Sequence, residues 1–174
     1  MMILCKIFLL TLTLLPVEDI KWQRVDTEEQ ISFLFPNYPQ KLQKLVQGIP
    51  STIYQTKDLT CVAGVVCSDL SSKNIKLDNE TAMLFYEELK KGTLAMETAI
   101  LKNESSVPYE NLLIKEIEYS IIKGKYEMTY YKRFIFRDNY IYQISIGGRT
   151  RHLDILQKER EVFFNSITFS SKHS

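Results

Sequence analysis

Residues 117–146 read IEYSIIKGKYEMTYYKRFIFRDNYIYQISI, and apolar and polar side chains alternate through most of this stretch. Such alternation is typical of β-strands that turn one face to a core. Two polar turns interrupt it, at Lys123-Gly124-Lys125 and at Asp138-Asn139, and both residues of the second tolerate the positive φ of a type I′ hairpin. The stretch therefore predicts an antiparallel three-strand meander. Its core face is expected to hold Tyr126, Met128, Tyr130, Phe134, Phe136, Tyr140, Tyr142, Ile144 and Ile146.

Helices are expected on either side of the meander along the chain. Asp78 can cap a helix over residues 79–101, in which apolar side chains recur at helical spacing. A polar loop is expected over residues 103–108. After residue 146, Gly147-Gly148 is expected to release the chain into a last helix, followed by a short terminal strand at residues 167–169. The apolar stripe of this helix consists of Leu153, Leu156, Phe163 and Phe164.

Short strands are expected earlier in the chain. Residues 31–35 alternate apolar and other side chains until two prolines, Pro36 and Pro39, prevent further ladder bonding. Residues 49–56 and 59–68 flank Lys57-Asp58, a polar pair suited to a tight hairpin turn.

Two short motifs resemble those of a known family. Phe35-Pro36-x-x-Pro39 and the closing Phe163-Phe164-Asn-Ser166-Ile-Thr-Phe169, together with the order of elements over residues 22–169, resemble exported bacterial PsbP-like domains. The resemblance implies an α+β fold: a single antiparallel β-sheet flanked by helices on both faces, an α/β/α sandwich. It also implies a family of binding and assembly roles without a common catalytic motif. No functional residue can be transferred from it.

Composition and charge exclude several classes of protein. The chain has 174 residues, 45% of them hydrophobic, with 22 Lys and Arg against 21 Asp and Glu, which excludes a disordered chain, a collagen and a polytopic membrane protein. A balanced charge gives no attraction for nucleic acid or for an anionic membrane surface. Residues 130–134 mix aromatics with cations, as single-strand nucleic-acid platforms do, but we interpret them as core and solvated face. No nucleic-acid partner is predicted.

The N-terminal segment has the layout of an export signal. Lys6 precedes an apolar run over residues 7–15, and Pro16 breaks the run before two carboxylates. The run is about half the ~20 residues that a membrane-spanning helix needs. We therefore predict a signal peptide over residues 1–17 and a single domain over residues 18–174, exported to the periplasm, cell envelope or exterior, with no membrane span once the signal is removed. Residues 16–19 lack a small-x-small cleavage pattern, so an uncleaved anchor is the alternative and the cleavage position stays open.

Cys61 and Cys67 are expected to be free thiols in a core. Six residues of strand separate their Cα atoms by ~20 Å, well beyond the ~7 Å limit of a disulfide. The alternative is a bridge permitted by a sharp bend at Gly64. A metal site is disfavoured because no His or further Cys lies nearby in sequence, and no cofactor is predicted.

The candidate ligand-binding residues are Gly147, Gly148, Arg149 and Arg151. Glycines before a helix N-terminus expose backbone N–H groups, and two arginines can hold an anion such as a phosphate or carboxylate. The alternative is a turn that simply requires glycine. The segment matches neither a P-loop nor a dinucleotide fingerprint.

Catalysis is weakly supported. His152 lies beside Asp154 and near Ser145, but no Gly-x-Ser-x-Gly elbow is present and no catalytic residue is predicted. Asn79-Glu-Thr81 and Asn103-Glu-Ser105 match the N-glycosylation pattern, which matters only in a eukaryotic secretory pathway.

The sequence therefore predicts an exported, non-catalytic binding or assembly module with an unknown protein partner in the envelope or extracellular space. One alternative is a small-ligand carrier, which requires a closed apolar cavity beside the strands of Tyr126 and Tyr142. A second is a hydrolase using His152, which requires a cleft where His152 meets a carboxylate and a hydroxyl.

Overall fold

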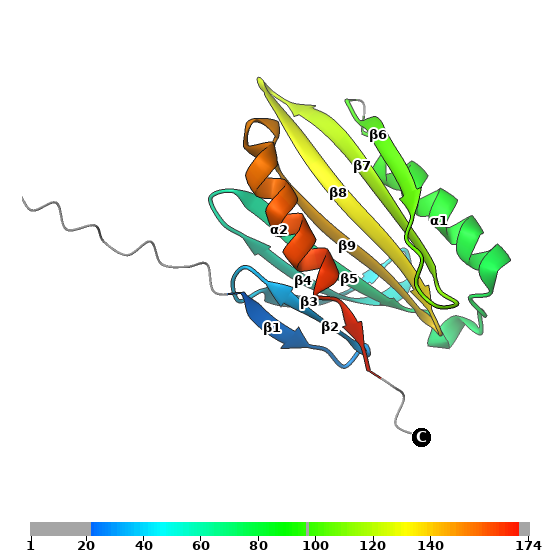
Figure 1. Cartoon of the computed structure of the whole chain (residues 1–174). Helices are drawn as coiled ribbons and strands as arrows, with labels where there is room; N and C mark the ends of the chain where they lie inside the picture. The colour runs from blue at the N-terminus through cyan, green and yellow to red at the C-terminus, as the bar shows by residue number, and fades with distance from the viewer. Residues whose placement is uncertain (1–21, 97, 171–174) are drawn as a thin grey trace, which may run out of the picture.

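The computed structural model describes residues 22–96 and 98–170, which form the strands and helices of Figure 1. The predicted signal peptide lies outside the described residues. Among those described, neither helix is long and apolar enough to cross a membrane. In chain order the elements are β1 (Gln23–Asp26), β2 (Ile31–Phe35), β3 (Gln40–Val46), β4 (Ile49–Lys57), β5 (Cys61–Asp69), α1 (Asn79–Thr93), β6 (Ile100–Ser106), β7 (Leu113–Lys123), β8 (Tyr126–Arg137), β9 (Tyr140–Arg149), α2 (Leu153–Asn165) and β10 (Thr168–Phe169).

The predicted meander is confirmed. β7, β8 and β9 pair antiparallel, with Lys123 opposite Tyr126 and Arg137 opposite Tyr140, so both connections are two-residue hairpins. Asp138 has a φ of 53°, but Asn139 stays outside the left-handed region, so the second turn is not of type I′.

The strands form two sheets instead of the single sheet expected. The large sheet has the order β3-β4-β5-β9-β8-β7-β6, and a small sheet has the order β1-β2-β10. The N-terminal strands join the meander through one long antiparallel pairing, in which β5 lies beside β9 from Cys61 opposite Gly148 to Asp69 opposite Tyr140. The predicted terminal strand is confirmed as β10, which pairs with β2.

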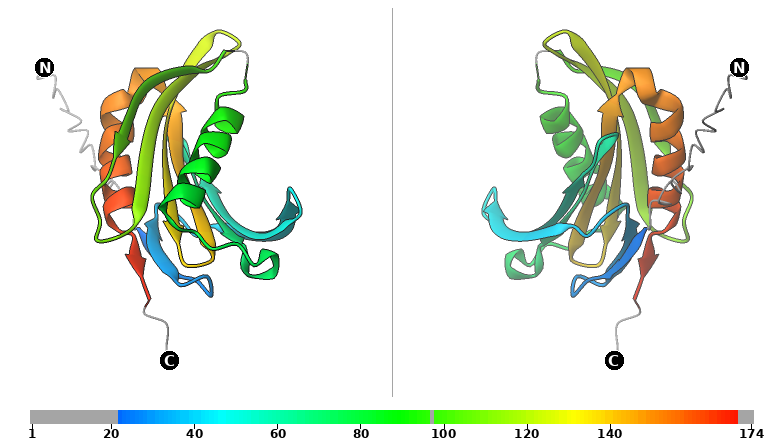
Figure 2. Two further views of the ribbon diagram at one scale, coloured as in Figure 1. Left: turned by 90° about the vertical axis from the view of Figure 1, so that its right-hand side faces the viewer. Right: turned by 90° about the vertical axis from the view of Figure 1, so that its left-hand side faces the viewer.

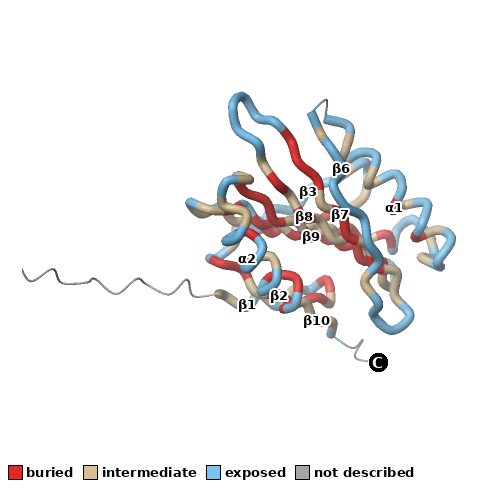
Figure 3. Tube along the Cα trace, turned by 45° about the horizontal axis from the view of Figure 1, so that its top comes forward, coloured by how far each residue is buried: buried red, intermediate tan, exposed pale blue. Residues whose placement is uncertain are grey.

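Both faces of the large sheet are buried near its centre, as the expected helices on both faces require, although the alternation in the meander alone had indicated a single core face. α2 and β2 cover one face and α1 covers part of the other (Figure 2). Ile141, on the face of β9 opposite Tyr142, is 3% exposed, whereas Tyr126, expected in the core, is 40% exposed. Helices therefore lie on both faces, but α1 covers only the β7–β8 side and the layers of a full sandwich are incomplete. Figure 3 shows burial concentrated in the central strands.

Two of the three strands that the sequence did not predict, β3 and β6, are the edges of the large sheet, and the third is β1 of the small sheet. α1 begins as expected, with the Asp78 side chain accepting a hydrogen bond of 2.9 Å from Thr81 N, but it ends at Thr93. β6 takes the place of the expected end of the helix and the expected polar loop. β3 was not predicted either. Both strands are almost wholly exposed, so their sequences lack the alternation that marks a half-buried strand.

A buried ion cluster ties α2 to the sheet. Glu116 of β7 is 7% exposed, and its carboxylate accepts hydrogen bonds from Arg133 of β8 and from Arg160 of α2. Arg133 also donates to the Phe164 carbonyl oxygen at 2.9 Å. The buried carboxylate therefore has two cationic partners, as a charge in a core requires.

Candidate functional site

A pocket of about 520 Å³ lies at one end of the large sheet, and we call it the end pocket. The β4–β5 turn, the ends of β7 and β8, the last residues of β9 and the 3₁₀ turn before α2 meet there. All four predicted anion-binding residues line it. Its lining consists of Lys57, Asp58, Leu59, Thr60, Cys61, Val62, Lys123, Tyr126, Met128, Gly147, Gly148, Arg149, Arg151 and His152. A cavity of similar volume, about 530 Å³, has Glu28, Glu29 and Asp69 in its lining and includes none of the predicted residues.

Four cationic side chains line the end pocket, and none of them forms an ion pair with a described carboxylate. They are Lys57, Lys123, Arg149 and Arg151. Arg149 stacks on Tyr126, with 4.1 Å between the guanidinium carbon and the ring centre. Such stacking fixes the guanidinium plane and leaves its N–H edges for a ligand.

Gly147 and Gly148 lie inside β9, which corrects the expected loop before a helix. β9 pairs with β5 on one side and β8 on the other, so these backbone N–H groups belong to a sheet. Close packing against neighbouring atoms explains why glycine occupies both positions. A Cβ on Gly147 would lie 2.1 Å from the Tyr130 ring, and one on Gly148 would lie 2.6 Å from the Thr60 carbonyl oxygen. α2 begins only after a 3₁₀ turn at Thr150–His152.

His152 is placed in the pocket but not in a catalytic arrangement. Its Nε2 accepts a hydrogen bond of 3.0 Å from Arg151 Nε, and within the described residues no hydrogen bond joins it to Asp154 or Ser145. Ser145 is not part of the pocket lining. The geometry gives no support to the hydrolase hypothesis.

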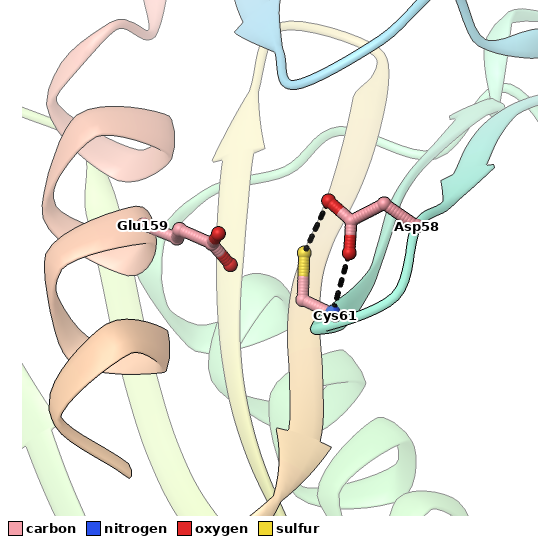
Figure 4. Close-up of side chains that lie close together, drawn as sticks. All are labelled: Asp58, Cys61 and Glu159. Atoms are coloured by element: carbon pink, nitrogen blue, oxygen red, sulfur yellow. Dashed lines mark hydrogen bonds between the residues drawn. The ribbon is translucent and has the colours of Figure 1, made fainter. Parts of the chain in front are cut away.

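Three side chains gather beside the end pocket: the half-buried Asp58 and the buried Cys61, which line it, and the buried Glu159 (Figure 4). Asp58 Oδ1 accepts hydrogen bonds from Thr60 N, Thr60 Oγ1 and Cys61 N at 2.6, 2.8 and 2.7 Å. Burial alone would raise the pKa of Asp58, but these hydrogen bonds outweigh it and hold that pKa below its usual value. They also fix the β4–β5 turn.

Cys61 and Glu159 face each other from β5 and α2. Burial, followed by the nearby Glu159 and Asp58 carboxylates, raises the pKa of the Cys61 thiol. Glu159 is 7% exposed, and its Oε1 accepts a 3.2 Å hydrogen bond from Thr60 Oγ1. Its Oε2 is buried without any partner among the described residues.

Sequence reasoning missed this group because it considered only His and Cys as metal ligands. Asp58 could have been found from the sequence, because it lies only three residues before Cys61. Glu159 could not, because only the packing of α2 brings it close to Cys61. The prediction of two free buried cysteines is confirmed.

The carrier hypothesis expected a closed cavity beside Tyr126 and Tyr142. Tyr142 is instead part of the core, fully buried, with its hydroxyl donating to the Glu29 carbonyl oxygen at 2.7 Å. Tyr126 lies at the open end pocket. The possible glycosylation residues Asn79 and Asn103 are both exposed, at the start of α1 and within β6.

No protein-family model and no curated protein matches the chain. Among solved structures, cyanobacterial PsbP from Synechocystis sp. PCC 6803 is similar with a TM-score of 0.59 and 15% identity, over 89% of this chain and 96% of that one. The chain has the PsbP fold. The PsbP-like architecture predicted from the Phe35 and Phe163 motifs is thus confirmed.

Two further structures align less well with this PsbP-like chain. A protein of unknown function from Pseudomonas aeruginosa, a putative regulator, has a TM-score of 0.45 at 11% identity, over 88% of this chain and 99% of that one. LpqN of Mycobacterium tuberculosis, involved in cell envelope biogenesis, has a TM-score of 0.46 at 12% identity, over 90% of this chain and 82% of that one. The PsbP fold is compatible with a non-catalytic module but does not define a role, because one fold hosts many functions.

Proposed function

We propose that the chain is an exported, non-catalytic binding module that recognises an anionic group, a carboxylate or phosphate, in the end pocket. The observation that carries the proposal is the set of four cations, Lys57, Lys123, Arg149 and Arg151, that line one pocket without ion-pair partners among the described residues. Cations from separate segments that converge on one cavity create a local positive potential on a chain of balanced charge.

Asp58 offsets one of the four positive charges and leaves the pocket with a cationic excess. It is the one carboxylate in the lining, and its Oδ1 accepts three hydrogen bonds from Thr60 and Cys61. Arg149 is the best-placed contact, because Tyr126 holds its guanidinium plane and bidentate arginine pairs with carboxylate or phosphate are among the stronger polar contacts. We expect the anion to belong to a protein partner in the envelope or extracellular space.

The test is equilibrium binding of inorganic phosphate and of succinate, followed by calorimetry, for the full chain and for an Arg149→Gln/Arg151→Gln variant. The variant should lose at least about tenfold in affinity, since a charge-assisted hydrogen bond is worth about 1.5–3 kcal/mol, and binding should weaken with added salt. The matched control is Lys76→Gln/Lys158→Gln, which removes two exposed cations outside the pocket. Undetectable binding of both probes, or equal affinity in the two double variants, would contradict the proposal.

Export is tested separately by the intact mass of the protein recovered from its host, with the cell fraction recorded. For a cleaved signal peptide we expect an envelope or extracellular protein whose mass is lower than that of the full chain by about the first 17–21 residues. A full-length mass in the soluble cytosol would be the contrary result.

A further inference from the structure

The group of Asp58, Cys61 and Glu159, which we call the thiol–carboxylate cluster, has one half-buried and two buried members and carries acidic groups without a described cation. Glu159 is 7% and Cys61 3% exposed, and within the described residues no Lys, Arg or His forms an ion pair with Asp58 or Glu159. Metal-ligating atoms of the three side chains all lie within 4.8 Å of one another. Buried charge without a partner is costly, so the cluster calls for an explanation.

The same protein shows how it accommodates another buried glutamate. Glu116, which is also 7% exposed, has hydrogen bonds from two guanidinium groups, those of Arg133 and Arg160. Among the described residues, Glu159 has the Thr60 hydroxyl, at 3.2 Å, and the weakly donating thiol of Cys61 beside it. The difference is a missing positive charge at Glu159.

The available protons do not satisfy the cluster either. Thr60 Oγ1 has one hydrogen, and both Asp58 Oδ1 at 2.8 Å and Glu159 Oε1 at 3.2 Å compete for it. The Cys61 thiol has one weak donor hydrogen, which is directed to Asp58 Oδ2 at 3.7 Å. Glu159 Oε2 is buried without a hydrogen-bond partner among the described residues, and Figure 4 shows the Glu159 carboxylate pointing toward Cys61.

We propose that Asp58, Cys61 and Glu159 bind a divalent transition-metal cation of the Zn²⁺ class. The ligand atoms would be Asp58 Oδ2, Cys61 Sγ and Glu159 Oε2. Zinc bonds of about 2.0–2.3 Å place tetrahedral ligand atoms about 3.3–3.8 Å apart. Cys61 Sγ and Asp58 Oδ2, at 3.7 Å, already have this spacing. The widest spacing in the cluster, at most 4.8 Å, must close by up to about 1.5 Å. Asp58 and its turn are already fixed by three hydrogen bonds, as an ordered ligand should be.

The donor set selects the class of metal. Mg²⁺ and Ca²⁺ prefer ligand sets made entirely of oxygen atoms, so a sulfur ligand disfavours both ions. Mixed sulfur and carboxylate ligands suit Zn²⁺ and its neighbours among the transition metals. Binding replaces the thiol hydrogen, which leaves as a proton to solvent. Two carboxylates and a thiolate place three negative charges at the ion, which offset the repulsion from the four cations that line the pocket, Lys57, Lys123, Arg149 and Arg151.

The geometry also provides an entry path. Asp58 and Cys61 both line the end pocket, so an ion can enter from solvent and a fourth ligand can reach it from the same side. The metal proposal does not depend on the anion-binding proposal, which rests on cations that contribute no metal ligand.

The test is a titration of Co²⁺ into the untagged full chain after removal of metals by chelation. A Cys5→Ser background removes the cysteine outside the described residues. We expect one equivalent of Co²⁺ to give the visible bands of a tetrahedral site and a near-ultraviolet thiolate-to-cobalt band, both abolished by Zn²⁺. Cys61→Ser should lose the thiolate band, and Glu159→Gln should weaken Co²⁺ binding at least tenfold.

Matched controls are Cys67→Ser, which removes the other buried thiol, and Glu161→Gln, which removes an exposed carboxylate of the same helix; both should bind as the parent does. A thiolate band that persists in Cys61→Ser, or Co²⁺ spectra without such a band in the parent chain, would overturn the proposal. A second readout needs no variant: Zn²⁺ at 100-fold excess over its dissociation constant adds about 2.7 kcal/mol to stability. Failure of Zn²⁺ to raise the Tm of the parent chain would equally overturn the proposal.

Discussion

Single side chains show where the fold accepts an energetic cost. Lys132 of β8 lies between the sheet and the end of α1, and its Nζ donates to Thr93 Oγ1 at 3.0 Å without forming an ion pair with any described carboxylate. Burial lowers the pKa of Lys132 from 10.5 to about 8. The charged form is therefore destabilised in the folded protein.

Lys132→Met should stabilise the protein at pH 7 by up to about 3 kcal/mol, the equivalent of the pKa shift. Between pH 8 and 10.5 the unfolded chain holds this proton and the folded chain releases it, so wild-type stability rises with pH and the advantage of the variant shrinks. Below pH 8 both states are protonated and the full penalty remains. Urea unfolding at pH 7 and 10 measures the effect, with the exposed Lys158→Met as control. An advantage that does not change with pH would disprove this account.

Gly148 is required by packing. In Gly148→Ala the new Cβ would lie 2.6 Å from the Thr60 carbonyl oxygen, which is backbone of the β4–β5 turn and must shift. We expect a loss of about 1–3 kcal/mol, typical of overpacking. Gly92→Ala in α1 meets nothing within 4 Å and should gain about 0.5–1 kcal/mol from helix propensity. Equal denaturation midpoints for the two variants would rule out this explanation.

At the scale of elements, the ion cluster of Glu116, Arg133 and Arg160 holds α2 against the large sheet. Glu116→Ala leaves Arg133 and Arg160 without their carboxylate, so we expect a loss of about 3–5 kcal/mol. Glu127→Ala is the control, because Glu127 is exposed and 4.0 Å from Lys102, and it should change stability by less than about 1 kcal/mol. Chemical denaturation of both variants gives the comparison, and similar losses would show that the cluster does not hold α2.

Which elements the sequence could predict follows from burial. The strands around Tyr142 and Ile144 are half or fully buried, so their alternation and turns were readable, as was the Asp78 cap. β3 and β6 are exposed edges that are strands only because a neighbour offers hydrogen-bonding groups, a cause that lies outside their own residues. No local pattern could reveal them.

Only part of the candidate site could be predicted, because its geometry also depends on contacts between distant segments. Gly147 to Arg151 were selected as a loop, yet they reach the end pocket as the end of a strand and a 3₁₀ turn. Lys57 and Lys123 line the same pocket only because of the register of five paired strands, β4-β5-β9-β8-β7. Glu159 meets Cys61 because α2 packs across β9, which is a tertiary fact without a sequence signal.

At the scale of the whole molecule, the sheet should be unequally stable. β8 and β9 are paired on both sides and covered on both faces, whereas β3 and β6 have one neighbour each and are almost wholly exposed. Hydrogen exchange followed by mass spectrometry should find the slowest amides in β8 and β9 and the fastest strand amides in β3 and β6. Protection of β3 or β6 equal to that of β9 in the isolated chain would contradict this ranking.

The pairing of β5 with β9 also sets an order for biogenesis. A nascent chain presents β3, β4 and β5 long before residues 140–149 have been synthesised, and until then β5 has an open edge. Phe33 and Phe35 of β2 likewise lack a packing partner until Phe163 of α2 has been synthesised. In the folded protein the centre of the Phe163 ring lies 6.5 Å from that of Phe33 and 5.1 Å from that of Phe35. Contacts this distant in sequence are costly to close early. The N-terminal half thus leaves the ribosome without a finished core, and the last third of the chain completes it.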